Sequence, residues 1–473
     1  MIAVEQGLLP RTPVVGRVER WTIGDRMQAY TVPGVSVAVF SGGRLAWAKG
    51  YGVCQAGDPE RPVTPTTLFQ AASMSKPVCA TAALQLVAEG MIGLDEPANR
   101  YLASWQLPDN DFTRRRPVTL RHILSHTAGL NVHGFEGFEQ GDMLPSVQEI
   151  LRGDGAAKTA PVMAVHEPGS RYQYSGGGTT IAQLLVMELH GQPFDRAVRE
   201  RIFAPLEIRD ATFAQPLGND LAGRAASGHR AGPVVLPGRW RNLPQLGAGG
   251  LWCTPAAYAQ FLIGLSEAYQ GKSDTLLPRD LAAEMMRRQG PGPFGLGPRV
   301  FGEGEALRIE HGGSQQGYQC ESVCYPATGD GAVVMTNSDL GSPLAFEILN
   351  AVASVYGWPS FLRSPRNIRP AAVSDLDRYV GTYRITSGME AEFIGIRRDG
   401  DMLFALMDQV PDTPVFVGED GQLFSPLTPY DVKVEFGPGG QVGSVAVHEE
   451  DLVILTADRD ETMAGWRPTR RGG

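Results

Sequence analysis

Residues 69–90 read Phe-Gln-Ala-Ala-Ser-Met-Ser-Lys-Pro-Val-Cys-Ala-Thr-Ala-Ala-Leu-Gln-Leu-Val-Ala-Glu-Gly, and the architecture can be worked out from this segment. Its apolar residues recur at helical spacing, at Val78, Ala82 and Leu86. Gly90 provides a stop signal, and Pro77 is tolerated because it falls in the first turn. The pattern predicts a helix with Ser73 at its entrance.

Ser73 and Lys76 are three positions apart, so on one helix face the serine Oγ and the lysine Nζ can approach each other. A serine needs a nearby base to become a nucleophile, and a buried lysine with a depressed pKa can be that base. The chain has 42 Lys+Arg but only five lysines, so 42 − 5 = 37 are arginine. Arginine cannot release its proton in a protein, so it could not act as the base at this position. A lysine at position 76 in such an arginine-rich chain therefore favours the catalytic interpretation. The alternative is that this Ser-x-x-Lys occurs by chance.

The chain has 473 residues and a mass of 50.9 kDa, which predicts one large domain and a smaller one. A net charge of −9 and a pI near 5.5 argue against nucleic acid or an anionic membrane as partner. Residues 1–20 are mixed and polar, so we expect no signal peptide and a cytoplasmic location. The five cysteines show no metal spacing and are expected to be buried free thiols.

Strand-like runs lie near both ends of the first 357 residues. Residues 35–40 and 45–51 flank Ser-Gly-Gly as a hairpin would, and residues 319–325 and 332–337 flank a second turn before a helix over 343–356. The sequence between these early and late strand-like runs has mainly helical and loop-like patterns. We therefore expect an α+β fold, in which an antiparallel sheet completed by the first and last segments is flanked by helices and carries a helical insert.

A proline- and arginine-rich stretch follows. Residues 358–370 have the composition of a linker, and beyond them seven short strand-like runs alternate with turns, which is typical of a small β-barrel or sandwich. The expected organisation is a catalytic domain over 1–357, the linker, a β-barrel domain over 371–462, and a tail over 463–473 that is disordered from residue 467.

A second candidate group reads Arg171-Tyr-Gln-Tyr-Ser-Gly-Gly-Gly-Thr-Thr180. Tyr174 lies just before the glycines, so its hydroxyl is expected at a loop tip beside a cleft. A phenol near a lysine ammonium can ionise and move protons between nucleophile and leaving group. The alternative is a structural tyrosine before a flexible turn. No Gly-Lys-Ser/Thr follows, which argues against a phosphate loop.

A third group reads Glu310-His-Gly-Gly-Ser-Gln-Gln-Gly317. Its small residues let a substrate backbone approach the sheet edge, and the imidazole of His311 can hydrogen-bond into the site, although a surface turn has the same composition. His122 and His126 have helical metal spacing but lack the Glu of His-Glu-x-x-His. We expect no metal there, and a local capping or hydrogen-bonding role for His126.

The loop over residues 131–145 combines aromatic and acidic side chains. They are Phe135, Glu136, Phe138, Glu139 and Asp142. The loop is either a lid whose acidic lip attracts a substrate amine or a solvated loop without such a role.

Ser73-x-x-Lys76, Tyr174-Ser-Gly176 and His311-Gly-Gly313, in this order, resemble the three active-site motifs of the serine β-lactamase and penicillin-binding-protein superfamily. The resemblance is closest to its class C-like branch, with D-aminopeptidases, D-alanyl-D-alanine carboxypeptidases and esterases. Residues 124–130 and 247–255 are also similar to stretches of that branch. The resemblance covers about residues 15–357, and the C-terminal β-domain resembles the lipocalin-like modules of some members.

The resemblance implies an acyl-enzyme mechanism without metal or cofactor. Ser73 would attack the carbonyl, with Lys76 and Tyr174 activating it and passing its proton to the leaving group. His311 would complete the catalytic set, and the backbone N–H groups of Ser73 and Ser314 would form the oxyanion hole. The substrate would lie against Gly176, Gly312, Gly313, Phe135 and Phe138.

Two departures from the superfamily pattern affect the substrate. The usual Tyr-x-Asn ends in Gly176, so the side-chain amide that holds a β-lactam or peptide amide is missing. The usual Lys-Thr-Gly begins with His311, which replaces a permanent cation by a group mostly neutral at pH 7. Both changes predict weak or no β-lactamase activity.

The favoured function is therefore hydrolysis of small peptide or amide substrates, including those built from D-amino acids. The first alternative is a carboxylesterase acting on short acyl esters, and the second is a non-catalytic binding protein on a hydrolase fold. The expected partner is a small-molecule or short-peptide substrate. We expect neither nucleic acid nor a membrane as a partner. The sequence leaves open whether the protein forms a homo-oligomer.

Overall fold

A computed structural model describes residues 1–17, 20–370, 373–387, 392–407, 412–450, 452–463 and 465–468. Its contacts divide the chain into two compact units. The first comprises Met1 and Gly24–Ala345, and the second comprises Ile2–Ile23 together with Phe346–Gly473. From residue 469 on, the predicted disordered tail lies outside the described residues.

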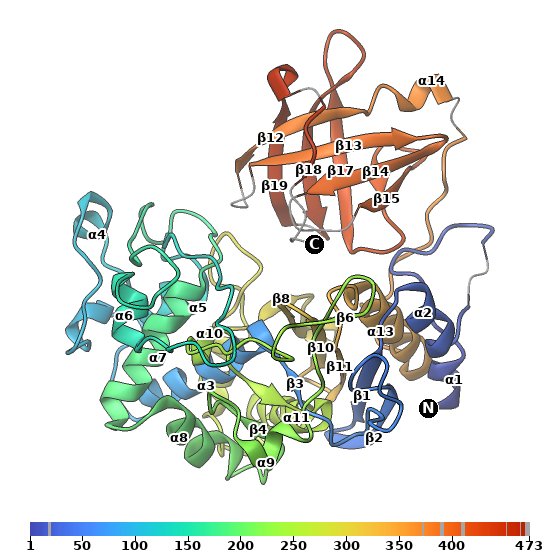
Figure 1. Cartoon of the computed structure of the whole chain (residues 1–473). Helices are drawn as coiled ribbons and strands as arrows, with labels where there is room; N and C mark the ends of the chain where they lie inside the picture. The colour runs from blue at the N-terminus through green and yellow to red at the C-terminus, as the bar shows by residue number, and fades with distance from the viewer. Residues whose placement is uncertain are drawn as a thin grey trace. The chain divides into compact units, whose positions relative to one another are not determined.

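The first unit is built on a six-stranded antiparallel sheet with the order β2-β1-β11-β10-β9-β8. The strands are β1 (Gly34–Ser41), β2 (Arg44–Gly52), β8 (Arg299–Phe301), β9 (Arg308–Gln315), β10 (Tyr318–Tyr325) and β11 (Asp330–Thr336). The predicted hairpin is β1–β2, and Val35 of β1 lies opposite Thr336 of β11 (Figure 1). The prediction that early and late segments complete one sheet is confirmed.

The sheet is covered by α11 (Pro255–Gln270), which contacts β1, β2, β10 and β11. Thr254 caps the start of this helix by accepting from the Ala257 N–H at 3.1 Å, and Gly271 ends it in a left-handed conformation with φ of 69°. Every residue of β1 from Gly34 to Phe40 is buried, because the strand is central in the sheet and lies under this helix.

The helical insert packs around a central helix, α3 (Ser75–Ala88). Its residues 75–86 are all buried, so the predicted helix is confirmed and is surrounded by protein. The helices that pack with it or with each other are α5 (Leu120–Leu124), α7 (Gly176–His190), α8 (Phe194–Val198) and α10 (Leu246–Gly249).

Shorter elements complete the first unit. They are β3 (Phe69–Gln70), η1 (Ala72–Met74), η2 (Ala98–Arg100), α4 (Asp111–Arg115), α6 (Val147–Arg152), the π-helical η3 (Arg199–Phe203), β4 (Ala211–Thr212), α9 (Asn219–Ala222), β5 (His229–Arg230), β6 (Val234–Val235), β7 (Trp252–Cys253), α12 (Arg279–Met285) and η4 (Gly304–Ala306). Two helices span the division between the units, α2 (Ile23–Ala29) and α13 (Ser342–Tyr356), the second of which confirms the helix predicted over 343–356.

The second unit contains a closed eight-stranded antiparallel barrel. Its strands are β12 (Gly381–Ser387), β13 (Phe393–Asp399), β14 (Met402–Met407), β15 (Thr413–Val417), β16 (Leu423–Phe424), β17 (Tyr430–Phe436), β18 (Val442–Glu449) and β19 (Leu452–Arg459). The predicted barrel is confirmed, but the sequence indicated seven strands and missed β16, because two residues are too few to show alternation. The unit also contains α1 (Ile2–Glu5), α14 (Val373–Leu376) and η5 (Glu461–Met463).

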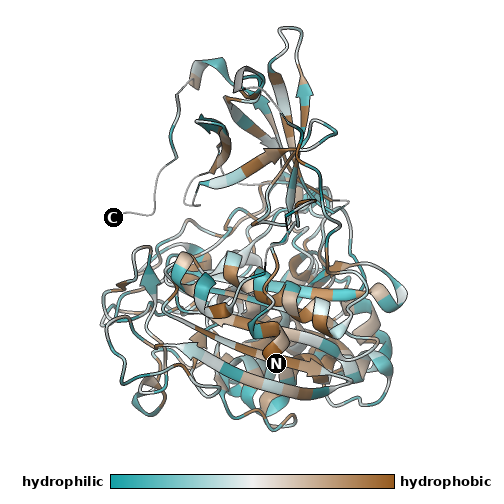
Figure 2. Ribbon diagram, turned by 90° about the vertical axis from the view of Figure 1, so that its right-hand side faces the viewer, coloured by the Kyte–Doolittle hydropathy of each residue, from teal (hydrophilic) through white to brown (hydrophobic). Residues whose placement is uncertain are grey.

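Apolar and polar residues alternate along the barrel strands (Figure 2). The buried apolar side chains of these strands form the core of the barrel. Tyr383 lies in this core with no exposed surface, and its hydroxyl donates to the Tyr379 carbonyl at 2.8 Å. The partner of the buried hydroxyl is therefore supplied by the chain just before β12.

The N-terminal segment of the second unit pairs with residues far along the chain. The Arg11 guanidinium donates to the Phe361 carbonyl at 3.0 Å and to Oδ1 of Asn350 at 3.3 Å. The Val15 N–H donates to the Arg366 carbonyl at 3.0 Å, and the Thr12 N–H donates to the Pro426 carbonyl at 3.3 Å. Residues 358–370, predicted to be a linker, therefore carry an ordered set of hydrogen bonds to residues 11–15.

All five cysteines are buried and free, which confirms the expectation from the sequence. Within the described part of the chain, no helix combines the length and the apolar character needed to cross a membrane.

Candidate active site

Ser73 lies on the short helical turn η1, immediately before α3. The preceding residue, Ala72, has a φ of 47°, a left-handed conformation that costs energy for a residue with a side chain. Two hydrogen bonds hold this turn, because the Ser75 hydroxyl donates to the Ala72 carbonyl at 2.6 Å and accepts from the Leu251 N–H at 3.0 Å. The fold thus fixes Ser73, half-buried, in a strained turn at the helix entrance.

Lys76 lies one turn further along, with only 4% of its surface exposed. Its Nζ donates to Oγ of Ser73 at 3.0 Å and to the Ala248 carbonyl at 2.7 Å. Burial lowers the pKa of Lys76 to about 7, since a charged ammonium is poorly solvated there. The expected approach of Ser73 and Lys76 is present, and the lysine is poised to exchange a proton near neutral pH.

Tyr174 lies against the same lysine, whose Nζ is 4.8 Å from the centre of the phenol ring. Burial raises the pKa of Tyr174 well above its usual value, although a hydrogen bond with Ser73 and the charge of Arg299 act in the opposite direction. The phenol is therefore neutral at rest. Tyr174 stands just before the start of α7, which Ser175 caps by accepting from the Gly178 N–H at 3.1 Å.

His126 contacts Tyr174 directly, a relationship that the sequence analysis did not identify. The two ring centres are 4.2 Å apart, and Nδ1 of His126 accepts a hydrogen bond from the Ser175 N–H at 3.1 Å. The side chain is 2% exposed, and burial holds its pKa well below the usual value, so the ring is neutral. The expected local hydrogen bond of His126 is therefore present, on the backbone beside Tyr174.

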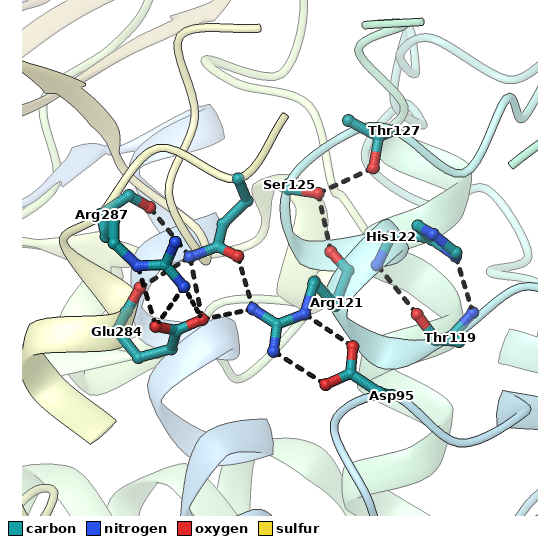
Figure 3. Close-up of polar contacts among 9 residues, drawn as sticks. Asp95, Thr119, Arg121, His122, Ser125, Thr127, Glu284 and Arg287 are labelled. Atoms are coloured by element: carbon teal, nitrogen blue, oxygen red, sulfur yellow. Dashed lines mark hydrogen bonds and ion pairs between the residues drawn. The ribbon is translucent and has the colours of Figure 1, made fainter. Parts of the chain in front are cut away.

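The turn that carries His126 follows α5, which is fixed by the polar network in Figure 3. The Arg121 guanidinium lies between Asp95, at 2.6 and 2.8 Å, and Glu284. The Ser125 hydroxyl donates to the Arg121 carbonyl at 2.7 Å and lies 2.9 Å from the Thr127 hydroxyl. This network anchors both sides of the residue that contacts Tyr174.

His122 and His126 each accept a backbone hydrogen bond. Nδ1 of His122 accepts from the Thr119 N–H at 3.3 Å as part of the cap of α5, while Nδ1 of His126 is engaged with Ser175. Burial lowers the pKa of His122 to about 4. No three acidic, cysteine or histidine side chains gather as potential metal ligands anywhere in the described ranges.

His311, Gly312, Gly313 and Ser314 lie on β9, beside the turn that carries Ser73. Pairing between β8 and β9 ends at Glu310, so the outer edge of β9 beyond this residue is not covered by β8. A Cβ built on Gly313 would lie 2.1 Å from the Ala71 carbonyl oxygen, which explains why the position needs glycine. Ser314 is exposed on this strand, which contacts the turn that carries Ser73.

The imidazole of His311 is 4% exposed, and its Nδ1 lies 2.7 Å from the Gly312 carbonyl. Its Nε2 is buried and has no hydrogen-bond partner among the described residues. Burial and the charge of Lys76 lower the pKa of His311 to about 3. At neutral pH the site therefore holds an uncharged imidazole with one nitrogen available.

The loop over residues 131–145 borders the same region, but two of its acids are engaged. Glu139 pairs with Arg241 at 2.6 Å, and Asp142 pairs with Lys158 at 3.4 Å. Phe135 is half-buried next to Gly176, whereas Phe138 is 2% exposed, with Nζ of Lys158 4.5 Å from its ring centre. The structure therefore brings Phe135 to the site and buries Phe138 in the base of the loop.

The chain is similar to several known proteins. A family model described as Beta-lactamase matches residues 20–356. Protein Rv1367c of Mycobacterium tuberculosis is 30% identical over 228 residues, which are 42% of this chain and 54% of that protein. Esterase EstB of Burkholderia gladioli is 31% identical over 159 residues, which are 32% of this chain and 40% of EstB. The chain thus matches about half the length of these curated relatives, or less.

Solved structures with the same fold extend over more of the chain. An octameric penicillin-binding protein homologue from Pyrococcus abyssi superposes with a TM-score of 0.63 and 20% identity, covering 92% of this chain and 98% of that one. D-amino acid amidase from Ochrobactrum anthropi has a TM-score of 0.56 and 24% identity, covering 71% of this chain and 97% of the amidase. At these identities the likeness concerns the fold alone.

Proposed function

The chain belongs to the Beta-lactamase family, and from this premise we propose that it is a serine hydrolase that works through an acyl-enzyme intermediate on small carboxylic esters. The observation that carries the proposal is the contact between Nζ of Lys76 and Oγ of Ser73 at 3.0 Å, in a buried site where the lysine pKa is about 7. This pairing has the elements of an activated nucleophile.

In the proposed first step, neutral Lys76 accepts the hydroxyl proton as Ser73 Oγ bonds to the substrate carbonyl carbon. The N–H groups of Ser73 and Ser314 bind the resulting oxyanion, an interaction worth about 3–4 kcal/mol per donor in such enzymes. The proton then passes through the Tyr174 hydroxyl to the leaving oxygen, the carbon–oxygen bond breaks, and an alcohol departs. Water attacks the acyl-serine, giving up one proton to the base, and releases the acid and Ser73.

Tyr174 acts here as a relay and a hydrogen-bond donor, and Lys76 acts as the resting base. This division of roles is supported by the opposite pKa shifts of the two groups, since burial favours the neutral form of each. His311 donates to or accepts from the bound substrate as a neutral imidazole, which its low pKa supports.

The charges around the site favour an uncharged substrate over an amine. Glu139 and Asp142 already have basic partners, so the loop presents less negative charge than its sequence indicates. The charge of Arg299, which acts on His311, also makes the site unfavourable for a substrate ammonium. Short esters carry no ammonium group. A peptide amide would lack the asparagine side chain that Gly176 replaces, and a β-lactam carboxylate would lack the permanent cation that His311 replaces.

A second candidate, hydrolysis of amides that carry a free amino group, rests on Glu136. This residue is exposed next to Phe135, and its carboxylate has no basic partner within the described part of the chain. It could hold the ammonium of a D-amino-acid amide at the rim of the site.

One experiment separates these functions. Initial rates would be measured on p-nitrophenyl acetate and on a D-aminoacyl p-nitroanilide, for the wild type, Ser73→Ala and Glu136→Gln. We expect ester hydrolysis that falls at least about 10³-fold in Ser73→Ala. The exposed Ser104→Ala is the matched serine control and should keep the wild-type rate.

Anilide turnover that needs both Ser73 and Glu136 would favour the amidase. Rates that do not depend on Ser73 would exclude the catalytic proposal and leave the binding-protein alternative.

A further inference from the structure

Gly176 is surrounded so closely that a side chain there would have to displace one of its neighbours. A Cβ built on Gly176 would lie 2.9 Å from Cε2 of Phe135 and 3.0 Å from the His133 carbonyl oxygen. This is the third position of the Tyr174-Ser-Gly176 motif, where the related pattern carries an asparagine. The space beside the motif is therefore taken by the edge of an aromatic ring from a different segment.

Hydrogen bonds hold the backbone of the segment that precedes this ring. The Gly176 N–H donates to the His133 carbonyl at 2.8 Å, and the Gly177 N–H donates to the Val132 carbonyl at 3.0 Å. The Ser175 hydroxyl donates to the same Val132 carbonyl at 2.7 Å. The segment just before Phe135 is thus tied to the first turn of α7, so the ring occupies a built position and not a free loop tip.

Residues close to Phe135 in the sequence contact two parts of the proposed catalytic site. On one side, the ring of His133 is 5.1 Å from the ring of Tyr174, centre to centre. On the other side, Nε2 of Gln315, the residue after Ser314, donates to the Glu136 carbonyl at 3.1 Å. The residues flanking Phe135 therefore contact the proton relay on one side and the oxyanion strand on the other.

Other rings continue this apolar lining. Phe294 lies 5.8 Å from Tyr174 and 5.8 Å from His311, measured between ring centres. Both Tyr174 and His311 are neutral at pH 7, because burial disfavours their charged forms. Phe294 and His311 are themselves buried, so they support this side of the site from behind, and the surface beside position 176 offers aromatic rings and no side-chain amide.

We propose that Phe135, packed against Gly176, forms the wall of an acyl-side subsite that selects apolar, preferably aromatic, acyl groups such as phenylacetyl. The inference rests on the proposed function and narrows its substrate class. The acyl group gains dispersion and desolvation energy against the ring, where a β-lactam or peptide would seek a side-chain amide. Arylalkanoic esters should thus be preferred over acetyl esters.

The test compares kcat/KM for p-nitrophenyl acetate, butyrate and phenylacetate, which share one leaving group. We expect the wild type to prefer phenylacetate over acetate by about tenfold or more. Phe135→Ala should bring this ratio close to one, because the ring that favours the aromatic acyl group is removed. Gly176→Ala, whose added Cβ displaces the ring, should also lower the ratio.

Met143→Ala is the matched control, since Met143 is an apolar residue of the same loop with 82% of its surface exposed. It should keep the wild-type ratio. Phe135→Leu covers the case in which Phe135→Ala fails to fold, as judged by thermal unfolding, and should lose the preference for phenylacetate over butyrate.

A phenylacetate-to-acetate ratio that stays at its wild-type value in the folded Phe135 variants would overturn the subsite while leaving the esterase proposal intact. A wild type that hydrolyses all three esters equally would do the same. Absence of any Ser73-dependent hydrolysis would instead overturn the proposed function, and the subsite with it.

Discussion

His126 holds the chain on both sides of Tyr174. Its carbonyl accepts from the Gln173 N–H at 2.8 Å, its ring Nδ1 accepts from the Ser175 N–H at 3.1 Å, and the ring itself lies 4.2 Å from the phenol. His126 also adopts a left-handed conformation with φ of 56°, which histidine tolerates better than most residues. One residue therefore sets both the backbone and the ring orientation of the proposed proton relay.

Replacing His126 should affect the chemical step more than substrate binding. In His126→Ala we expect kcat for p-nitrophenyl acetate to fall about 10- to 100-fold with KM changed less than about threefold, because a misplaced relay weakens only proton transfer. His126→Asn, which tolerates the left-handed backbone and retains an acceptor, should recover part of kcat. A wild-type kcat in a folded His126→Ala variant would exclude the positioning role.

The rate of ester hydrolysis should depend on the protonation of Lys76. Because the base must be neutral, kcat/KM should rise with pH through an apparent pKa near 7. Lys76→Arg keeps the positive charge but cannot release the proton, so it should lower kcat/KM by about 10²- to 10⁴-fold at every pH. A pH–rate profile that is flat between pH 5.5 and 8.5 would contradict the assignment of Lys76 as base.

The same lysine should reduce stability in a pH-dependent way. Its pKa is about 7 in the folded protein and has an ordinary value of 10.5, so between these values the unfolded chain binds more protons than the folded one. The free energy of unfolding therefore increases with pH across this window, and the full cost of the buried ammonium is present below pH 7. The free energy of unfolding of Lys76→Met should therefore exceed that of the wild type by more at pH 6 than at pH 9.5.

Chemical denaturation of the wild type and Lys76→Met at both pH values measures this effect. Ser73→Ala, which keeps the lysine, is the control and should follow the pH dependence of the wild type. A difference between Lys76→Met and the wild type that is equal at pH 6 and pH 9.5 would exclude a buried, shifted lysine.

The second unit should depend on Asp431, which accepts from Arg363 and, at 2.7 Å, from Arg366. Removing the carboxylate leaves two half-buried guanidinium groups without this acceptor, so Asp431→Ala should cost about 1–3 kcal/mol of unfolding free energy. Asp399→Ala is the control, because Asp399 pairs with Arg397 from a 75% exposed position and should change stability by less than about 0.5 kcal/mol. Equal destabilisation by both variants in calorimetry would contradict this role.

Much of the site could be predicted because its signals are local. The spacing of Ser73 and Lys76 is a property of one helix, and their contact follows from it. The paired strands of the sheet were recognisable because β1 and β11 are long enough to show their pattern. The barrel followed from the regular spacing of its strands, apart from β16, which has only two residues.

What the sequence could not predict depends on contacts between distant segments. Glu139 and Asp142 form ion pairs with basic residues that lie outside the loop in the sequence, and these pairs reduce the negative charge that the loop presents. The sequence showed only that Gly176 lacks the side-chain amide of the related pattern. That the ring of Phe135 packs against this glycine depends on a contact between two segments. For His126, the stretch over residues 124–130 was a signal, but its role required the position of Tyr174.

The hydrogen bonds of the N-terminal segment have a consequence for synthesis of the protein. Arg11 is synthesised 339 residues before its partner Asn350. Thr12 likewise precedes its partner Pro426, so neither hydrogen bond can form until the first unit, which ends at Ala345, has been translated. The second unit can therefore be completed only after residue 426 has been synthesised, when two segments far apart in the sequence pair with each other.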